Sequence, residues 1–135
     1  GAEGYPVKAP KKPRPVRHGM VFWARRGNGQ VLLRKRPEKG LLGGMMEIPS
    51  TGWRERAWTA AEATDQAPLS GHWWPLEGIV RHTFTHFHLE LMVLAGQVRA
   101  GAGGGEWCLP SRFSEHALPT LMKKVARHVA GALEK

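Results

Sequence analysis

The stretch Arg81–Leu91, RHTFTHFHLEL, allows two interpretations that lead to different folds and functions. In one continuous strand, successive side chains point to opposite faces of the sheet. His82, His86 and His88 would then share one face that resembles a zinc site, opposite an apolar face that belongs to a core. If the strand instead breaks at Phe84–His86, these three residues form the tip of a hairpin and can contact another molecule.

The flanking segments predict an α+β domain with a mixed sheet. Alternating apolar residues and turn signals predict strands at 16–25, 30–36, 72–82, 87–99 and 106–109. A short helix is expected at 57–66. After Pro119, the apolar residues Leu121, Met122, Val125 and Val129 recur at helical spacing, which predicts an amphipathic C-terminal helix.

The composition favours a single domain with a polyanionic partner. The chain has 135 residues, with 20 Lys+Arg against 11 Asp+Glu and a formal charge of +9. Such a charge suggests nucleic acid as the simplest partner. A membrane partner is not expected, because no apolar run approaches the roughly 18 residues of a spanning helix. Cys108 is the only cysteine, which excludes an internal disulfide and is compatible with a cytoplasmic protein. We expect a monomer.

The first fifteen residues, GAEGYPVKAPKKPRP, predict a basic, proline-rich linker, with the folded domain at 16–135. This linker can act as a solvated tether, as an arm that follows phosphates, or as both. The basic side chains that could contact DNA phosphates are Lys8, Lys11, Lys12 and Arg14 in the linker, and Arg34 and Arg36 on a predicted strand.

Two segments resemble the family of adenine DNA glycosylases known as MutY. Residues 40–53, GLLGGMMEIPSTGW, are similar to the family's GLWGG…E-F-P segment. RHTFTHFHLEL is similar to its H-x-F-[ST]-H-x-x-L loop, with the matching residues His82, Phe84, Thr85, His86 and Leu89. The linker also resembles the connector that precedes the C-terminal domain of this family. The resemblance covers most of the chain and implies a Nudix-like (MutT-like) fold, a mixed sheet with flanking helices.

The resemblance also implies a division of labour. In the family, the catalytic carboxylates and the 4Fe-4S cluster belong to an N-terminal helical domain. We therefore expect no catalytic residue, metal or cofactor in this chain. The implied partners are that glycosylase domain of the same protein and double-stranded DNA in which 8-oxoguanine lies opposite adenine. The implied role is base excision repair by a DNA glycosylase, a hydrolase, with this chain itself not catalytic.

Two alternatives remain open. A Nudix-type nucleotide hydrolase needs a helix carrying R-E-x-x-E-E, because several carboxylates must hold Mg²⁺ against a pyrophosphate. Here Arg54-Glu55 is followed by Trp58 and Thr59 where the paired glutamates belong, so hydrolysis is not expected. The second alternative is a protein-docking module that uses the basic connector.

The resemblance places the recognition of 8-oxoguanine at Phe84, Thr85 and His86. Guanine presents N7 as an acceptor in the major groove. Oxidation at C8 converts N7 into an N–H donor and adds a carbonyl. Thr85 can answer both changes, since its hydroxyl accepts and its hydroxyl or main-chain N–H donates. Phe84 either wedges beside the lesion or anchors the tip to the core. His86 could donate to a base edge or a phosphate.

Overall fold

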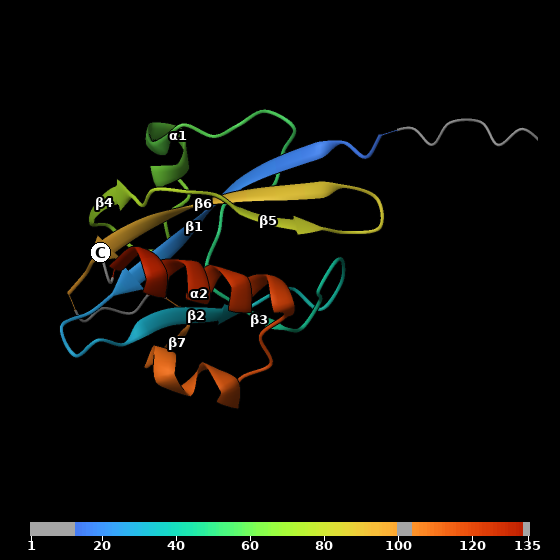
Figure 1. Cartoon of the computed structure of the whole chain (residues 1–135). Coiled ribbons are helices and arrows are strands. Elements are labelled where there is room, and N and C mark those ends of the chain that lie inside the picture. Colours follow the sequence, from blue (N-terminus) through green and yellow to red (C-terminus); the bar gives the residue numbers. More distant parts are fainter. Residues whose placement is uncertain (1–12, 100–103, 134–135) are drawn as a thin grey trace, which may run out of the picture.

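The computed structural model describes residues 13–99 and 104–133 and has the α+β architecture expected from the sequence (Figure 1). Lys8, Lys11 and Lys12 lie outside the described residues. The strands are β1 (Val16–Arg25), β2 (Val31–Lys35), β3 (Met46–Glu47), β4 (His72–Pro75), β5 (Val80–Thr83), β6 (His88–Gln97) and β7 (Glu106–Cys108). The helices are α1 (Ala60–Thr64), the 3-10 helix η1 (Pro110–Glu115) and α2 (Thr120–Leu133).

The strands form a mixed sheet in the order β3-β2-β1-β6-β4, with β5 also paired to β6 and β7 to β2. β1 and β6 run parallel, in register from Val16 opposite His88 to Arg25 opposite Gln97. The other strand pairs within the sheet are antiparallel. Because β1 and β6 run in the same direction, the segment before β1 and the loop before β6 lie at the same end of the sheet.

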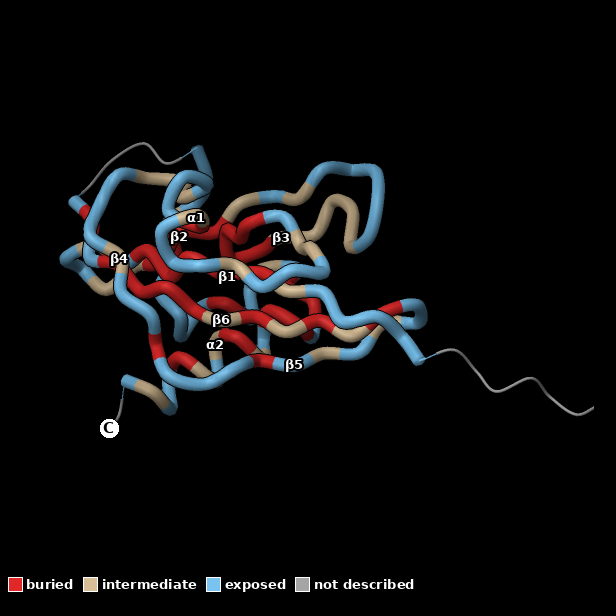
Figure 2. Tube along the Cα trace, turned by 90° about the horizontal axis from the view of Figure 1, so that it is seen from above, coloured by how far each residue is buried: buried red, intermediate tan, exposed pale blue. Residues whose placement is uncertain are grey.

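The core fills both faces of the two central strands. On β1, Val21 and Trp23 belong to the cluster that includes the apolar stripe of α2, whereas Met20 and Phe22 pack with Ala63 of α1. Seen from above, the buried segments follow β1, β6 and β2 through the middle of the molecule (Figure 2). Complete burial of a side chain such as Phe22 stabilises the fold by roughly 1.5–3 kcal/mol.

The structure corrects two predicted elements. The strand expected at 72–82 is two strands, because β4 ends at Pro75 and the chain turns at Gly78, whose φ is +96°. A side chain at Gly78 would also meet the His128 ring, 2.6 Å from the position of a Cβ. The helix expected at 57–66 is shorter, since Thr59 caps α1 and forms a capping box with Glu62.

The stretch 81–91 breaks into a hairpin, so the continuous strand is the wrong alternative. β5 ends at Thr83 and β6 begins at His88. Between them the Phe84 N–H donates to the Phe87 carbonyl at 2.8 Å and closes the turn. Both views show this hairpin projecting beside the first described residues of the chain (Figures 1 and 2). We call residues 84–87 the hairpin tip.

Candidate functional site

The hairpin tip presents two side chains outward and two inward. Thr85 and His86 are exposed, Phe84 is half-buried, and Phe87 is 7% exposed. The three residues predicted to contact a partner are therefore placed differently. Two of them form the outer surface of the tip, and the third lies in its base.

The base of the tip is an aromatic cluster. Phe84 stacks on Trp53 with ring centroids 5.9 Å apart, and it lies 4.9 Å from the Phe87 ring. The His82 ring meets Phe84 edge-on at 4.8 Å. Trp53 approaches β1 at Gly19, where a Cβ would lie only 2.7 Å from the indole Cδ1. A larger residue at Gly19 would push Trp53, and with it the support of the tip, away from the sheet.

A buried carboxylate supports this cluster from the side. Glu47 is 4% exposed and accepts from Arg34 Nε at 2.9 Å and from Arg36 at 2.7 Å. The Arg36 guanidinium also lies 5.0 Å from the centre of the Trp53 ring. The glutamate of the GLLGGMMEIPS segment is thus connected through Arg36 to Trp53, beneath the tip.

Arg34 and Arg36 were predicted to contact phosphates, and the structure gives both a structural partner. Their guanidinium groups bond to Glu47, so a phosphate would compete with that carboxylate for the same donors. Arg34 also donates to the Ser50 carbonyl at 2.9 Å, and Arg36 to the Leu41 carbonyl at 3.2 Å. Phosphate binding by these two residues stays a prediction.

His82 connects the hairpin to α2. Lys124 Nζ lies 3.0 Å from His82 Nδ1 and 3.2 Å from the Arg81 carbonyl. Burial, followed by the charge of Lys124, lowers the pKa of His82 below its ordinary value. A neutral His82 can accept from the Lys124 ammonium through Nδ1, so this ring is an acceptor in the support of the tip.

The histidines of the stretch do not assemble a metal site. His82 faces the Lys124 ammonium, and His88 Nδ1 lies 2.8 Å from the Thr83 hydroxyl. Within residues 13–99 and 104–133, no group of three or more His, Cys, Asp or Glu side chains could hold a metal ion. The zinc interpretation therefore finds no ligand set in this part of the chain.

The segment that enters β1 contacts the tip directly. Arg14 Nε donates to the Thr85 main-chain carbonyl at 2.9 Å, and the His88 N–H donates to the Pro15 carbonyl at 2.9 Å. The Arg17 guanidinium lies 4.4 Å from the centre of the Phe87 ring. Of the predicted linker residues, Arg14 is thus placed at the tip. Arg17 and Trp53 were missed as supports. Trp53 ends the segment 40–53, but nothing in that pattern indicates a contact with the tip.

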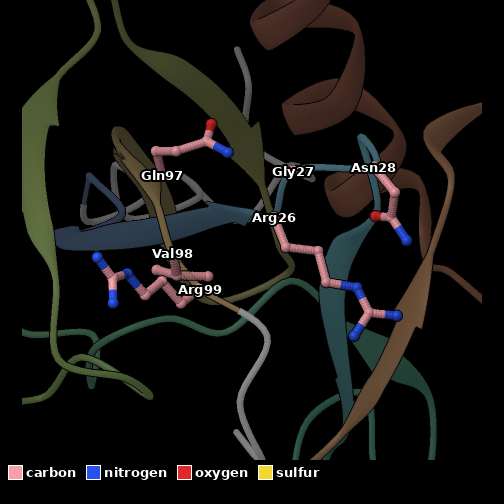
Figure 3. Close-up of a pocket in the computed structure, with 6 residues that line it drawn as sticks. All are labelled: Arg26, Gly27, Asn28, Gln97, Val98 and Arg99. Carbon is pink, nitrogen blue, oxygen red and sulfur yellow. The ribbon is translucent and has the colours of Figure 1, made fainter.

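A cavity of about 790 Å³ lies at the end of β1 and β6 opposite the hairpin tip, and its arginines do not form a binding site for an anion. It is lined by Arg26 and Arg99, among others. The two side chains extend away from each other (Figure 3). Arg26 Nε donates to Gln30 at 2.9 Å, and its guanidinium lies 4.7 Å from the centre of the Trp107 ring. The two cations therefore do not converge on one ligand.

Residues 20–128 match the family model described as NUDIX domain. The chain belongs to the Nudix family. It is also 33% identical to human adenine DNA glycosylase over 97% of this chain and 27% of that protein. The rat adenine DNA glycosylase is 31% identical over 94% of this chain and 28% of that protein. The resemblance inferred from the sequence is thus confirmed, and the chain spans about a quarter of the length of these relatives.

Solved structures support the same assignment. The C-terminal domain of mouse MUTYH, in a complex with human PCNA, has a TM-score of 0.65 and 25% identity, covering 85% of this chain and 88% of that one. The MutT protein of Methanosarcina mazei Go1 has a TM-score of 0.75 and 16% identity, covering 93% of this chain and 100% of that one. The second likeness shows the fold alone, and it agrees with the Nudix-like sheet expected from the sequence.

Among the described residues, the segment around α1 does not present a set of carboxylates that could hold Mg²⁺ against a pyrophosphate. Glu55 is exposed in the loop before α1, and Trp58 packs against the core cluster that contains Ala63. Glu62, on the five-residue α1, is paired with Arg54 at 2.9 Å. The hydrogen bond from Arg54, then that from Thr59, lowers the Glu62 pKa to about 2. A single carboxylate already held by arginine does not fit a catalytic metal site.

No described helix of this Nudix domain combines the length and the apolar character needed to cross a bilayer.

Proposed function

We propose that this Nudix domain binds double-stranded DNA and recognises 8-oxoguanine opposite adenine, as the C-terminal domain of an adenine DNA glycosylase. The likeness to the human and rat glycosylases over nearly the whole chain supports the parent activity. The formal charge of +9 suits a DNA partner. The observation that carries the recognition role is the exposed Thr85, presented at the end of a hairpin whose base is fixed by Phe84 and Phe87.

The chemistry of Thr85 matches the change that oxidation makes in guanine. The lesion offers an N–H at N7 and an oxygen at C8, whereas guanine has an acceptor at N7 and no oxygen at C8. A hydroxyl can accept from the first group, and a hydroxyl or a main-chain N–H can donate to the second. In the part of the chain that the structure describes, no residue hydrogen-bonds the Thr85 hydroxyl. The group is thus free to bond to a base.

We assign excision of the adenine to a glycosylase domain that precedes the basic connector in the same protein. The chain spans about a quarter of its curated relatives, which leaves room in them for such a domain. No catalytic residue and no cofactor is assigned to this chain. The phosphates next to the lesion would be contacted by Lys8, Lys11 and Lys12 of the connector, which position the protein without reading the base.

Binding of the purified chain to three duplexes tests the proposal. The duplexes are identical except for one pair, which is A opposite 8-oxoguanine, A opposite G, or A opposite T. We expect the first to bind more tightly, by roughly three- to a hundredfold. The lower value corresponds to the loss of one neutral hydrogen bond, and the upper value to a buried donor that is left unpaired. Equal affinity for the three duplexes would overturn the recognition role.

A protein-docking module is the second proposal. The C-terminal domain of mouse MUTYH was solved in a complex with human PCNA, which makes PCNA the partner to test. Binding to PCNA, together with the absence of any preference among the duplexes, would favour docking as the main role of this chain.

A further inference from the structure

Arg14 occupies an unusual place for a side chain of a connector. Its guanidinium Nε donates to the main-chain carbonyl of Thr85 at 2.9 Å, across 71 residues of sequence. This bond holds the peptide unit between Thr85 and His86, the two exposed residues of the tip. It involves neither the Thr85 hydroxyl nor the Thr85 N–H, so it leaves both groups available to a base.

The contact is one of three that join residues 14–17 to the hairpin tip or to His88, the first residue of β6. The Pro15 carbonyl accepts from the His88 N–H at 2.9 Å, and the Arg17 guanidinium covers the Phe87 ring at 4.4 Å. These contacts lie next to Val16 opposite His88, the first pair in the register of β1 and β6. The last residues of the connector are therefore part of the structure that holds the tip.

We propose that Arg14 is a positioning residue for Thr85, and that the connector thereby sets the geometry with which the tip reads a base. The proposal rests on the proposed recognition of 8-oxoguanine. The tip is exposed and short, and fixing its peptide before DNA binds reduces the ordering cost of recognition. A donor on a charged group is stronger than a neutral one, which suits it to hold a solvent-exposed carbonyl.

The competing role for Arg14 is the phosphate contact expected from the sequence. A phosphate contact would strengthen binding to every duplex alike, and its loss would flatten the plot of log K against log[salt] by about 0.9. A positioning contact would instead change the preference for the lesion and leave the salt slope unchanged. Arg14→Lys separates the two roles, since it keeps the positive charge but places a methylene where Nε stands.

The test compares Arg14→Ala, Arg14→Lys, Thr85→Ala and wild type, with Arg99→Ala as the matched control. Arg99 is an exposed arginine beyond the opposite end of β6. Affinity for the 8-oxoguanine and guanine duplexes is measured over a series of salt concentrations. Without DNA, amide exchange is followed at Phe84, whose N–H closes the turn of the tip. Melting temperature is recorded for each variant as a control for folding.

We expect both Arg14 variants to lose about three- to tenfold in lesion preference, the worth of one hydrogen bond. The Phe84 amide should exchange faster in both, while the salt slope of Arg14→Lys and the melting temperatures stay unchanged. Arg99→Ala should keep the wild-type preference.

A preference lost in Thr85→Ala but kept in both Arg14 variants would overturn the positioning role of Arg14 and leave the proposed function intact. A uniform loss of affinity in Arg14→Ala, restored in Arg14→Lys, would also overturn it. Absence of preference in the wild-type chain would overturn the proposed function and the positioning role with it.

Discussion

The ring of Phe84 stacks on the indole of Trp53, with centroids 5.9 Å apart and an angle of 25° between the planes. The side chain predicted either to wedge DNA or to anchor the tip is thus engaged within the protein. Phe84 also lines a cavity of about 410 Å³ beside the tip, together with Leu42 and residues at the start of α2. Removing its ring would enlarge that cavity and leave one face of Trp53 without a partner.

We therefore expect Phe84→Ala to lower the free energy of unfolding by about 1–3 kcal/mol, less than a fully buried phenylalanine would cost. Phe84→Leu should recover most of this loss, because it refills the apolar volume. Chemical denaturation of the two variants measures the effect, with the exposed neighbour His86→Ala as a control near wild type. Unchanged stability in Phe84→Ala, combined with lost lesion preference, would identify Phe84 as a group that acts on DNA instead.

The buried Glu47 provides a second prediction about the support of the tip. Glu47→Ala leaves Arg34 and Arg36 without their shared carboxylate, and we expect the free energy of unfolding to fall by roughly 2–4 kcal/mol. Glu38→Ala is the control, because Glu38 pairs with Lys35 at the surface, where its side chain is 73% exposed. If the denaturation curves of the two variants coincide, the Glu47 ion pairs contribute no more to stability than a surface ion pair does.

His82 predicts a dependence of stability on pH. Its pKa is lowered in the folded state from the ordinary value of 6.5, by burial and then by Lys124. Between the folded and the unfolded pKa, the unfolded chain binds more protons, so stability falls as the pH drops below about 6.5. Below the folded pKa this contribution is fully lost. His82→Gln keeps an acceptor for Lys124 but cannot titrate, and it should flatten the pH profile of unfolding below about pH 6.5. Parallel profiles for the two proteins would contradict this assignment.

Because the chain has a Nudix fold, an assay of nucleotide hydrolysis directly tests whether a catalytic Mg²⁺ site forms around α1. We expect no Mg²⁺-dependent release of phosphate or pyrophosphate from 8-oxo-dGTP, because Trp58 stands where a carboxylate is needed and Glu62 is held by Arg54. The assay measures product release by the purified chain with and without Mg²⁺. Turnover that disappears in Glu55→Gln would show that a metal site forms in spite of this arrangement.

Much of this fold could be predicted from local patterns. The apolar run of β1, the glycine turn at 27–29 and the stripe of α2 each determine an element within a few residues, and all three are present. The hairpin break was one of two alternatives, because alternation alone does not distinguish a long strand from two strands with a turn. The Phe84–Phe87 hydrogen bond decides between them, and Phe84 also stacks on Trp53, a residue of a distant segment.

The supports of the tip could not be predicted in the same way. Arg36 was assigned to phosphate because its charge is visible in the sequence, whereas its partner Glu47 is a residue of another strand. The role of Gly19 could not be predicted either. Its lack of a side chain leaves space for the Trp53 indole, which belongs to a different segment. Contacts of this kind arise only when distant segments are brought together, so no local periodicity reports them.

The central claim, that Thr85 reads 8-oxoguanine, is tested most directly by one comparison of lesion preference. In the protein that joins this chain to its glycosylase domain, Thr85→Ala and Thr85→Ser are compared with wild type for adenine excision opposite 8-oxoguanine and opposite guanine. Thr85→Ala should lose about three- to a hundredfold in preference. The lower value corresponds to one lost neutral hydrogen bond, and the upper value to a buried donor that is left unpaired. Thr85→Ser keeps the hydroxyl and should behave as wild type, and neither change should alter the melting temperature, because the side chain is exposed. Full preference retained in Thr85→Ala would contradict the account.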